Sequence, residues 1–161
     1  YLDPGRIFSI MSAATTTGAR AERLKKATLD AARAFGDPAR RSDYLELYDD
    51  NAAIYYTPQG TIKGIEAIKQ YYSGFWAAFP DARLELENVM AEGDRVACTF
   101  TVTGTHTGSA FNGIPAAGKK IAVTGASVLR FLDNGKCIER WHGADTLPLL
   151  QQLGAMPATP H

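Results

Sequence analysis

The sequence predicts an α+β domain in which helices come first and long antiparallel strands follow. Apolar residues in the first half recur at three- and four-residue spacing, which is the period of an amphipathic helix. The second half instead carries β-branched and aromatic runs separated by turn residues, which is typical of strands. The chain has 161 residues, of which 45% are hydrophobic, so one domain with a buried core is expected.

Two helices are predicted before the first strand. Residues 19–35 carry apolar side chains at helical spacing from Leu24 to Phe35, and Gly36 then provides a stop signal. A second, shorter helix is expected over residues 37–48, because its second residue is a proline, which suits a first turn. Together they predict a helical hairpin at the start of the domain.

Both ends of the chain are expected to lie outside the folded part. Residues 1–18 include a Ser-, Ala- and Thr-rich run after Met11, which predicts a disordered leader or an added segment before the natural start. Residues 156–161 are rich in proline and predict a flexible tail. A single domain is therefore expected over residues 19–155.

The middle of the chain predicts a short strand and a helix, and then mainly strands. Residues 52–57 are β-branched and aromatic and precede a proline, which favours a strand. The helix after Gly64 has one apolar side, made of Ile65, Ile68, Tyr72, Phe75 and Phe79, with Trp76 at its margin. Longer strands are predicted at residues 83–91, 95–105, 120–132 and 136–143, and a last helix at residues 146–153.

The dipeptide Asn134-Gly135 determines the expected pairing of the last two strands. Asn and Gly tolerate the positive φ angles of a two-residue type I′ turn, which would pair Asp133 with Lys136. Directly opposed residues keep a constant sum of positions, so the rest of the register follows. The predicted pairs are Arg130 with Glu139, Leu129 with Arg140, Val128 with Trp141, and Ser127 with His142.

This register places an imidazole beside a hydroxyl on one face of the hairpin. His142 and Ser127 are therefore our first candidates for catalysis, because histidine suits acid–base work near neutral pH. Asp145, three residues later, is expected to orient His142 or to cap the last helix. For His106, a loop-stabilising hydrogen bond is the alternative to a role in the site. The expected substrate-binding residues are Tyr48, Tyr55, Trp76, Phe100, His106, Leu129 and Arg140.

Composition excludes several classes of partner and cofactor. Seventeen basic and seventeen acidic residues balance, and no long basic run occurs, so neither nucleic acid nor a membrane surface is expected as a partner. No apolar run is long enough to cross a bilayer. Cys98 and Cys137 lie in predicted strands without metal-ligand spacing. We therefore expect a cytoplasmic protein with buried thiols that needs no metal or cofactor.

Four stretches carry a resemblance to a known family. They are residues 79–84 (FPDARL), 104–108 (GTHTG), 111–119 (FNGIPAAGK) and 145–154 (DTLPLLQQLG). Over residues 27–154 the chain resembles the SnoaL-like polyketide cyclases, which share a superfamily with nuclear transport factor 2, ketosteroid isomerase and limonene epoxide hydrolase. The resemblance implies a curved antiparallel or mixed sheet that N-terminal helices wrap into a cone around an apolar cavity.

The resemblance also implies roles for individual positions. In the cyclases, an aspartate on the last strand is the base of an intramolecular aldol ring closure, and a second aspartate follows three residues later. Those positions match His142 and Asp145, and the histidine of the neighbouring strand matches Ser127. The position of the ketosteroid isomerase base holds Thr57, which cannot serve as a base.

We therefore expect a small enzyme that moves a proton on a hydrophobic carbonyl or polyketide-like compound. His142 would abstract or relay the proton, and a neutral donor such as Ser127 would stabilise the oxyanion. The alternatives are an epoxide hydrolase, or a non-catalytic module that binds hydrophobic small molecules or dimerises. A homodimer is expected through the outer face of the hairpin, which carries Val128, Trp141 and the Arg130–Glu139 pair.

Overall fold

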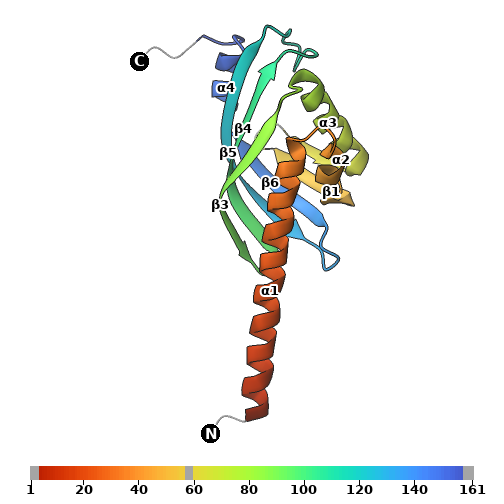
Figure 1. The fold of residues 1–161 in the computed structure, drawn as a ribbon, viewed down its shortest axis with the longest axis vertical. Coiled ribbons are helices and arrows are strands. Elements are labelled where there is room, and N and C mark those ends of the chain that lie inside the picture. The colour runs from red at the N-terminus through yellow and green to blue at the C-terminus, as the bar shows by residue number, and fades with distance from the viewer. Residues whose placement is uncertain (1–3, 57–59, 158–161) are drawn as a thin grey trace.

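The computed structural model describes residues 4–56 and 60–157, with side chains described from Thr16 onward. A curved six-stranded sheet forms one layer, and helices α1, α2 and α3 cover one of its faces (Figure 1). The strand order is β2-β1-β6-β5-β4-β3, in which the β1–β6 pair is parallel and the others are antiparallel. The elements are α1 Pro4–Phe35, α2 Arg41–Leu45, β1 Tyr48–Tyr56, β2 Gly60–Lys63, α3 Ile65–Ala78, β3 Arg83–Glu92, β4 Arg95–His106, β5 Lys119–Phe131, β6 Cys137–Ala144 and α4 Thr146–Gln152.

The predicted α+β class is confirmed, but several elements in the first half of the chain differ from expectation. Helix α1 begins at Pro4, well before the expected residue 19. Helix α2 ends at Leu45, because Tyr48 already belongs to β1 and pairs with Cys137 of β6. This long-range pairing overrides the local helical pattern. The four-residue edge strand β2 was not predicted, since a pattern so short has no clear alternation.

The register of the β5–β6 hairpin is confirmed from Ser127 to Arg130, but the predicted turn is wrong. The loop has three residues, because the amide of Leu132 donates to the carbonyl of Lys136 and Gly135 donates to Leu132. Gly135 has a φ of 83°, but Asn134 does not have the positive φ that a type I′ turn also requires. In the described chain the residues other than glycine with positive φ are Asn88 and Asn112. An irregularity between Arg130 and Phe131 then restores the predicted pairing further along the strands.

The core lies between the covering helices and the inner face of the sheet. Phe35 of α1 packs against Tyr44 at 5.2 Å and against Trp76 at 5.3 Å between ring centroids. Trp76 is 7% exposed and therefore central to the core rather than marginal as predicted. The fully buried residues of the sheet include Ile54, Val96, Phe100, Leu129 and Phe131. The helices thus close the concave side of the sheet.

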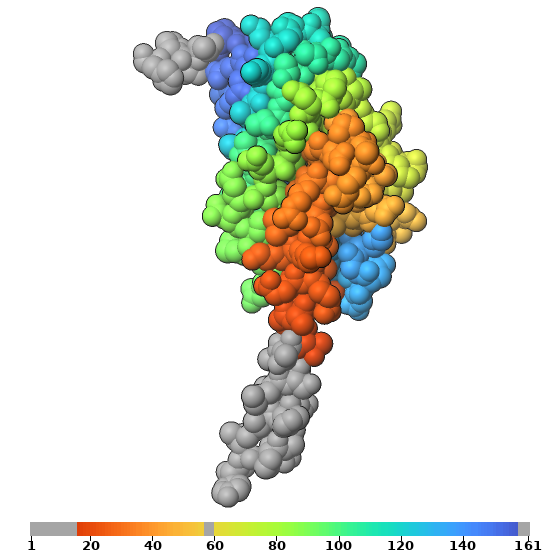
Figure 2. Space-filling view, viewed as in Figure 1, coloured from red at the N-terminus to blue at the C-terminus, as the bar shows by residue number. Residues whose placement is uncertain are grey.

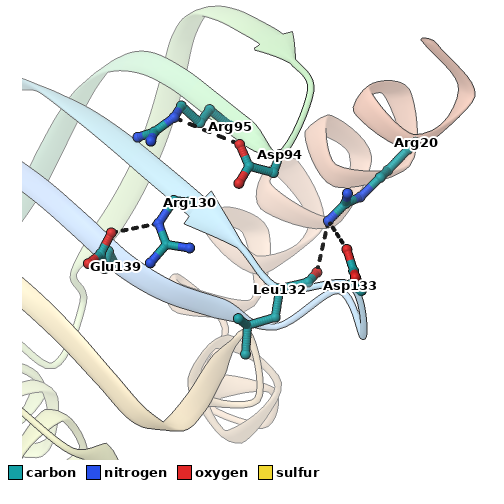
Figure 3. A network of polar contacts seen from close by, with 7 residues as sticks. All are labelled: Arg20, Asp94, Arg95, Arg130, Leu132, Asp133 and Glu139. Atoms are coloured by element: carbon teal, nitrogen blue, oxygen red, sulfur yellow. Dashed lines mark hydrogen bonds and ion pairs between the residues drawn. The ribbon is translucent and has the colours of Figure 1, made fainter. Parts of the chain in front are cut away.

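Helix α1 lies along the domain from the tip of the hairpin towards α2 (Figure 2). Near the hairpin, Arg20 donates to the carbonyl of Leu132 and forms an ion pair of 3.1 Å with Asp133 (Figure 3). The N-terminal turns of α1 extend past the sheet (Figure 1). No helix in the described part of the chain is long and apolar enough to cross a membrane.

The outer face of the sheet carries the predicted cross-strand pairs. Nε of Arg130 donates to Oε2 of Glu139 over 2.6 Å (Figure 3), and Val128 lies opposite Trp141. Trp141 is 39% exposed, with the guanidinium of Arg95 5.8 Å from its ring centroid. An exposed tryptophan beside an exposed valine forms an apolar patch on this face.

One glycine of α3 offers a test of the helix assignment. Gly74 lies in the helix interior and is exposed, and an added Cβ would meet no heavy atom within 4 Å. Replacing Gly74 with alanine is expected to stabilise the protein by up to about 1 kcal/mol, because glycine has the greater backbone freedom when unfolded. Urea denaturation measures this change, and a clear loss of stability would contradict the assignment of α3.

Candidate active site

His142 lies near the end of β6, on the sheet face that the helices cover. Ser127 of β5 is its partner across the hairpin, and Ser127 Oγ lies 2.9 Å from His142 Nδ1. Phe100 of β4 stacks on the imidazole with ring centroids 4.6 Å apart. Tyr56 of β1 is in parallel register with His142 and meets the ring edge-on at 4.7 Å. Three strands therefore position this imidazole, which is 9% exposed.

Arg140 lies two residues before His142 and hence on the same face of β6. It is 4% exposed, which is unusual for a charged side chain. Its Nε and Nη2 each donate to Ser127 Oγ over 3.2 Å. Its Nη1 donates to the hydroxyls of Tyr44 and Tyr48 over 2.8 Å and to that of Tyr72 over 3.3 Å. Ser127 thus connects Arg140 to His142.

These contacts indicate which nitrogen of His142 carries the proton. Arginine only donates hydrogen bonds, so the two lone pairs of Ser127 Oγ accept from Arg140. The hydroxyl hydrogen of Ser127 is then donated to Nδ1 of His142, which must be unprotonated to accept it. A neutral His142 therefore carries its proton on Nε2. That atom has no partner among the described residues and is not sealed from solvent, so its N–H is available to a ligand.

The electrostatics of the site keep His142 neutral. Burial, and then the positive charge of Arg140, lower the pKa of His142 to about 2. Burial also raises the pKa of Tyr48 and of Tyr56 well above the usual value for a phenol, so both remain protonated. The site consequently holds one permanent positive charge, Arg140, among neutral hydrogen-bonding groups.

A cavity of about 50 Å³ lies beside these residues. Its lining residues are Phe35, Tyr44, Tyr56, Tyr71, Tyr72, Phe75, Leu84, Val102, Arg140 and His142. None of them is a carboxylate. The cavity has room for a few water molecules and is smaller than the roughly 300 Å³ at the lower end of ordinary ligand pockets. A substrate of several rings can enter only if aromatic side chains of the lining move.

The structure brings together five of the residues that the sequence suggested for the site. They are Tyr48, Phe100, Ser127, Arg140 and His142, which are linked by the hydrogen bonds and ring contacts described above. Two further candidates pack next to this group without lining the cavity. Leu129 is a buried core residue opposite Arg140, and Trp76 packs against Tyr72 at 5.7 Å between ring centroids.

Tyr55 and Asp145 lie away from the cavity. Tyr55 stacks on Trp141 at 5.5 Å on the outer face of the sheet, because successive side chains of β1 point to opposite faces. Asp145 occupies the N-cap position of α4, but it is exposed and makes no side-chain cap hydrogen bond. The structure records no contact between Asp145 and His142, and Ser127 is the group that orients the imidazole.

His106 has the loop-stabilising role rather than a place in the site. It lies eight residues along β4 from Cys98, the strand partner of Ser127, which is roughly 26 Å at about 3.3 Å per residue. Its Nε2 lies 2.8 Å from the carbonyl oxygen of Ser109, and Phe79 packs on the ring at 5.0 Å. His106 therefore anchors the loop that follows β4.

Sequence reasoning missed four tyrosines of the site, which are Tyr44, Tyr56, Tyr71 and Tyr72. For Tyr56 a signal existed, because β1 and β6 pair in parallel and strand alternation then puts Tyr56 on the face of His142. That pairing joins segments far apart in the chain, so local patterns did not reveal it. In the described residues no group of three or more histidine, cysteine, aspartate or glutamate side chains could hold a metal ion.

Comparison with known proteins bears on this site. Residues 26–153 match the SnoaL-like polyketide cyclase family. The candidate hydroxylase AclR from Streptomyces galilaeus is 31% identical, with a TM-score of 0.76 over 87% of this chain and 86% of AclR. IdmH, a candidate polyketide cyclase from Streptomyces antibioticus, is 28% identical, with a TM-score of 0.65 over 81% and 96% of the two chains.

A more distant structure supports the fold. A candidate SnoaL-like polyketide cyclase from Jannaschia sp. CCS1 is 22% identical, with a TM-score of 0.72 over 86% of this chain and 94% of that protein. Comparison with curated proteins gave no match. The family match covers most of the sequence and agrees with the mixed, curved and unclosed sheet, so the chain belongs to the SnoaL-like polyketide cyclase family.

Proposed function

We propose that this protein is a small enzyme that transfers a proton to the oxygen of a hydrophobic carbonyl or polyketide-like compound, in an isomerisation or an aldol ring closure, without a cofactor. The observation that carries this proposal is the hydrogen-bond chain from Arg140 through Ser127 to Nδ1 of His142. This chain leaves Nε2–H of His142 as the donor beside an aromatic cavity. Membership of a polyketide cyclase family supports the substrate class.

In this mechanism His142 acts as a donor rather than as the base that its place in the family suggests. Nε2–H donates to the substrate oxygen, and the proton moves to that oxygen as negative charge develops on it. Nδ1 takes the hydroxyl proton of Ser127 at the same time, so the imidazole stays neutral. Two N–H groups of Arg140 stabilise the oxygen of Ser127. After the product leaves, Nε2 takes a proton from water and Nδ1 returns its proton to Ser127, which restores the starting tautomer.

Two observations favour a donor over a base. A histidine with a pKa of about 2 is a weak base near neutral pH, because an efficient base has a pKa close to the working pH. The cavity lining also contains no carboxylate that could take a proton from carbon or activate a water. A lining without a carboxylate also weakens the epoxide hydrolase alternative. The second candidate function is therefore the binding of a small hydrophobic compound without turnover.

A screen of apolar carbonyl compounds that form enols, monitored by deuterium incorporation or ring closure, tests the proposal. His142→Gln is expected to lower kcat/KM at least about tenfold, because it breaks the relay at its centre. Asp145→Asn is the matched control and should leave the rate unchanged, since Asp145 is exposed and does not contact His142. Equal loss in both variants would contradict the mechanism, and no turnover of any compound would favour the binding alternative.

The pH profile distinguishes a donor from a base. Because His142 stays neutral down to a pKa of about 2, kcat/KM should show no acid limb from this residue between pH 5 and 8. A histidine that works as a base with an ordinary pKa would instead lose activity below about pH 6.5. An acid limb near that value that disappears in His142→Gln would overturn the donor assignment.

We also propose that the protein forms a homodimer in the cytoplasm through the outer face of its sheet. The exposed Trp141 and Val128 support the interface, and the two free, buried cysteines are compatible with a reducing compartment. Trp141→Glu should convert a dimer into a monomer in light scattering, whereas Glu85→Gln, on an exposed position of β3, should not. A wild-type protein that is monomeric at high concentration would exclude the interface.

A further inference from the structure

We propose that the cavity receives its substrate as an anion, with Arg140 as the counter-ion of an ionised oxygen of the enolate or phenolate type. This inference rests on the proposed function and deepens it, because it specifies the charge state in which the carbonyl compound enters. Such a substrate needs no base in the site, which agrees with a lining that contains no carboxylate.

The charge of Arg140 is buried without a partner of opposite charge. All its described contacts are to neutral hydroxyls, those of Tyr44, Tyr48, Tyr72 and Ser127. None of the ion pairs in the described chain includes Arg140. A buried charge without a counter-ion costs several kcal/mol of solvation, which an incoming anion would recover in part.

The surrounding phenols do not supply the missing negative charge. Burial raises the pKa of Tyr48 and of Tyr56 well above the usual value and raises that of Tyr44 as well, even though Arg140 opposes the shift. The hydroxyl of Tyr44 also lies 3.2 Å from that of Tyr48, an arrangement that holds a shared hydrogen rather than two negative oxygens. The positive charge of the site therefore remains uncompensated.

Arg140 also has a hydrogen-bond donor that the described residues do not use. A guanidinium carries five N–H groups. Nε–H and one N–H of Nη2 are used by Ser127, and both of Nη1 are used by the tyrosines. One N–H of Nη2 has no acceptor among the described residues. Arg140 and His142 both line the cavity, so the two residues that have a donor to spare border the same small space.

An anionic substrate also balances the proposed reaction. An enolate carbon that attacks a carbonyl group forms one C–C bond and moves the negative charge to the former carbonyl oxygen. That oxygen gains the proton of His142 Nε2, and Nδ1 gains the proton of Ser127. The substrate enters with one negative charge and leaves neutral after taking one proton. The solvent then gives a proton to Nε2 of His142, and Nδ1 returns its proton to Ser127. No oxidant or reductant is required.

Binding of matched pairs of probes tests the inference without any turnover. Benzoate and benzamide have the same shape and differ in charge, and 4-nitrophenol is titrated through its own ionisation, which its absorption spectrum reports. Full-length wild-type protein, measured by calorimetry, is expected to bind 4-nitrophenolate at least about tenfold more tightly than neutral 4-nitrophenol, a difference of about 1.4 kcal/mol. Preference for nitrophenolate alone indicates a single oxyanion, whereas preference for benzoate indicates a carboxylate as the natural group and would overturn the enolate assignment.

Removal of the charge gives the second measurement. Arg140→Met fills similar space without charge, and Arg140→Lys keeps the charge without the planar fork. The anion preference should vanish in Arg140→Met and persist, weakened, in Arg140→Lys. Equal affinity for both members of each probe pair in the wild type, or binding of neither, would overturn the inference.

The outcomes for binding and for turnover are separable. A tenfold anion preference in a protein that turns over no carbonyl compound would support the inference and contradict the proposed enzymatic function. Turnover that depends on His142 in a protein with no anion preference would do the reverse. His142→Gln serves as a control in the binding experiment, because it exchanges one neutral side chain for another and should change the affinity for both members of a pair to a similar extent.

Discussion

Gly125→Ala is expected to destabilise the protein by about 3 kcal/mol or more, because the added methyl group has no space between two strands. Its Cβ would lie 2.1 Å from the carbonyl oxygen of Gly143 and 2.5 Å from Cζ of Phe100. The oxygen belongs to the backbone of β6, one residue beyond His142, and so cannot move without moving the strand. Phe100 is the ring that stacks on the imidazole. The substitution should therefore disturb both the sheet and the site.

Gly143→Ala provides the matched control for this prediction. Gly143 lies on the neighbouring strand, but its Cβ would come no nearer than 3.9 Å to another heavy atom, the carbonyl oxygen of Ala126. Its replacement should change the free energy of unfolding by less than about 1 kcal/mol, and in the stabilising direction. Urea denaturation of the two variants gives the comparison. Equal stability of the two would mean that β4, β5 and β6 are not packed as described around Gly125.

The sequence allowed the register of the last hairpin to be predicted because that information is local. A turn dipeptide and strand alternation were sufficient to place Ser127 opposite His142 and Arg140 on the same face. The predicted type of turn was wrong. The irregularity after Arg130 shifts the pairing by one residue, so the register beyond it is still the predicted one. The charge pair of Arg130 with Glu139 and the apolar pair on the same face are contacts that exist only in this register, and they explain why it is kept.

The rest of the site depends on contacts between distant segments. Tyr56 reaches His142 through the parallel β1–β6 pairing, and Tyr44 reaches Arg140 from a helix almost a hundred residues earlier in the chain. No periodicity in the sequence encodes either contact. Asp145 lies away from His142 for a different reason. The position three residues after His142 suits both a helix N-cap and a hydrogen-bond partner for His142. Only the direction that the chain takes after β6 distinguishes these two roles.

Acid is expected to unfold the protein partly through His142. The pKa of His142 is about 2 in the folded protein, where burial and then the charge of Arg140 lower it, and about 6.5 for the ordinary side chain. Between these values the unfolded chain binds a proton that the folded chain does not, so stability rises with pH there. The contribution of His142 is fully present above pH 6.5 and is lost progressively below it. Each unit of pH costs up to about 1.4 kcal/mol, or about 2 to 3 kcal/mol between pH 6.5 and 4.5.

Comparison with His142→Gln isolates this effect from that of the carboxylates. Hydrogen bonds from Thr105 and Arg130 lower the pKa of Asp81 and of Glu139, so these groups also lose stabilising interactions in acid, but they do so equally in both proteins. The wild type should therefore lose about 2 to 3 kcal/mol more than His142→Gln over that range. Equal losses would mean that His142 is protonated in the folded state. An imidazolium could no longer accept a hydrogen bond from Ser127, and His142 would again be a candidate for the base. The same measurement thus tests the buried, neutral imidazole and the donor role that follows from it.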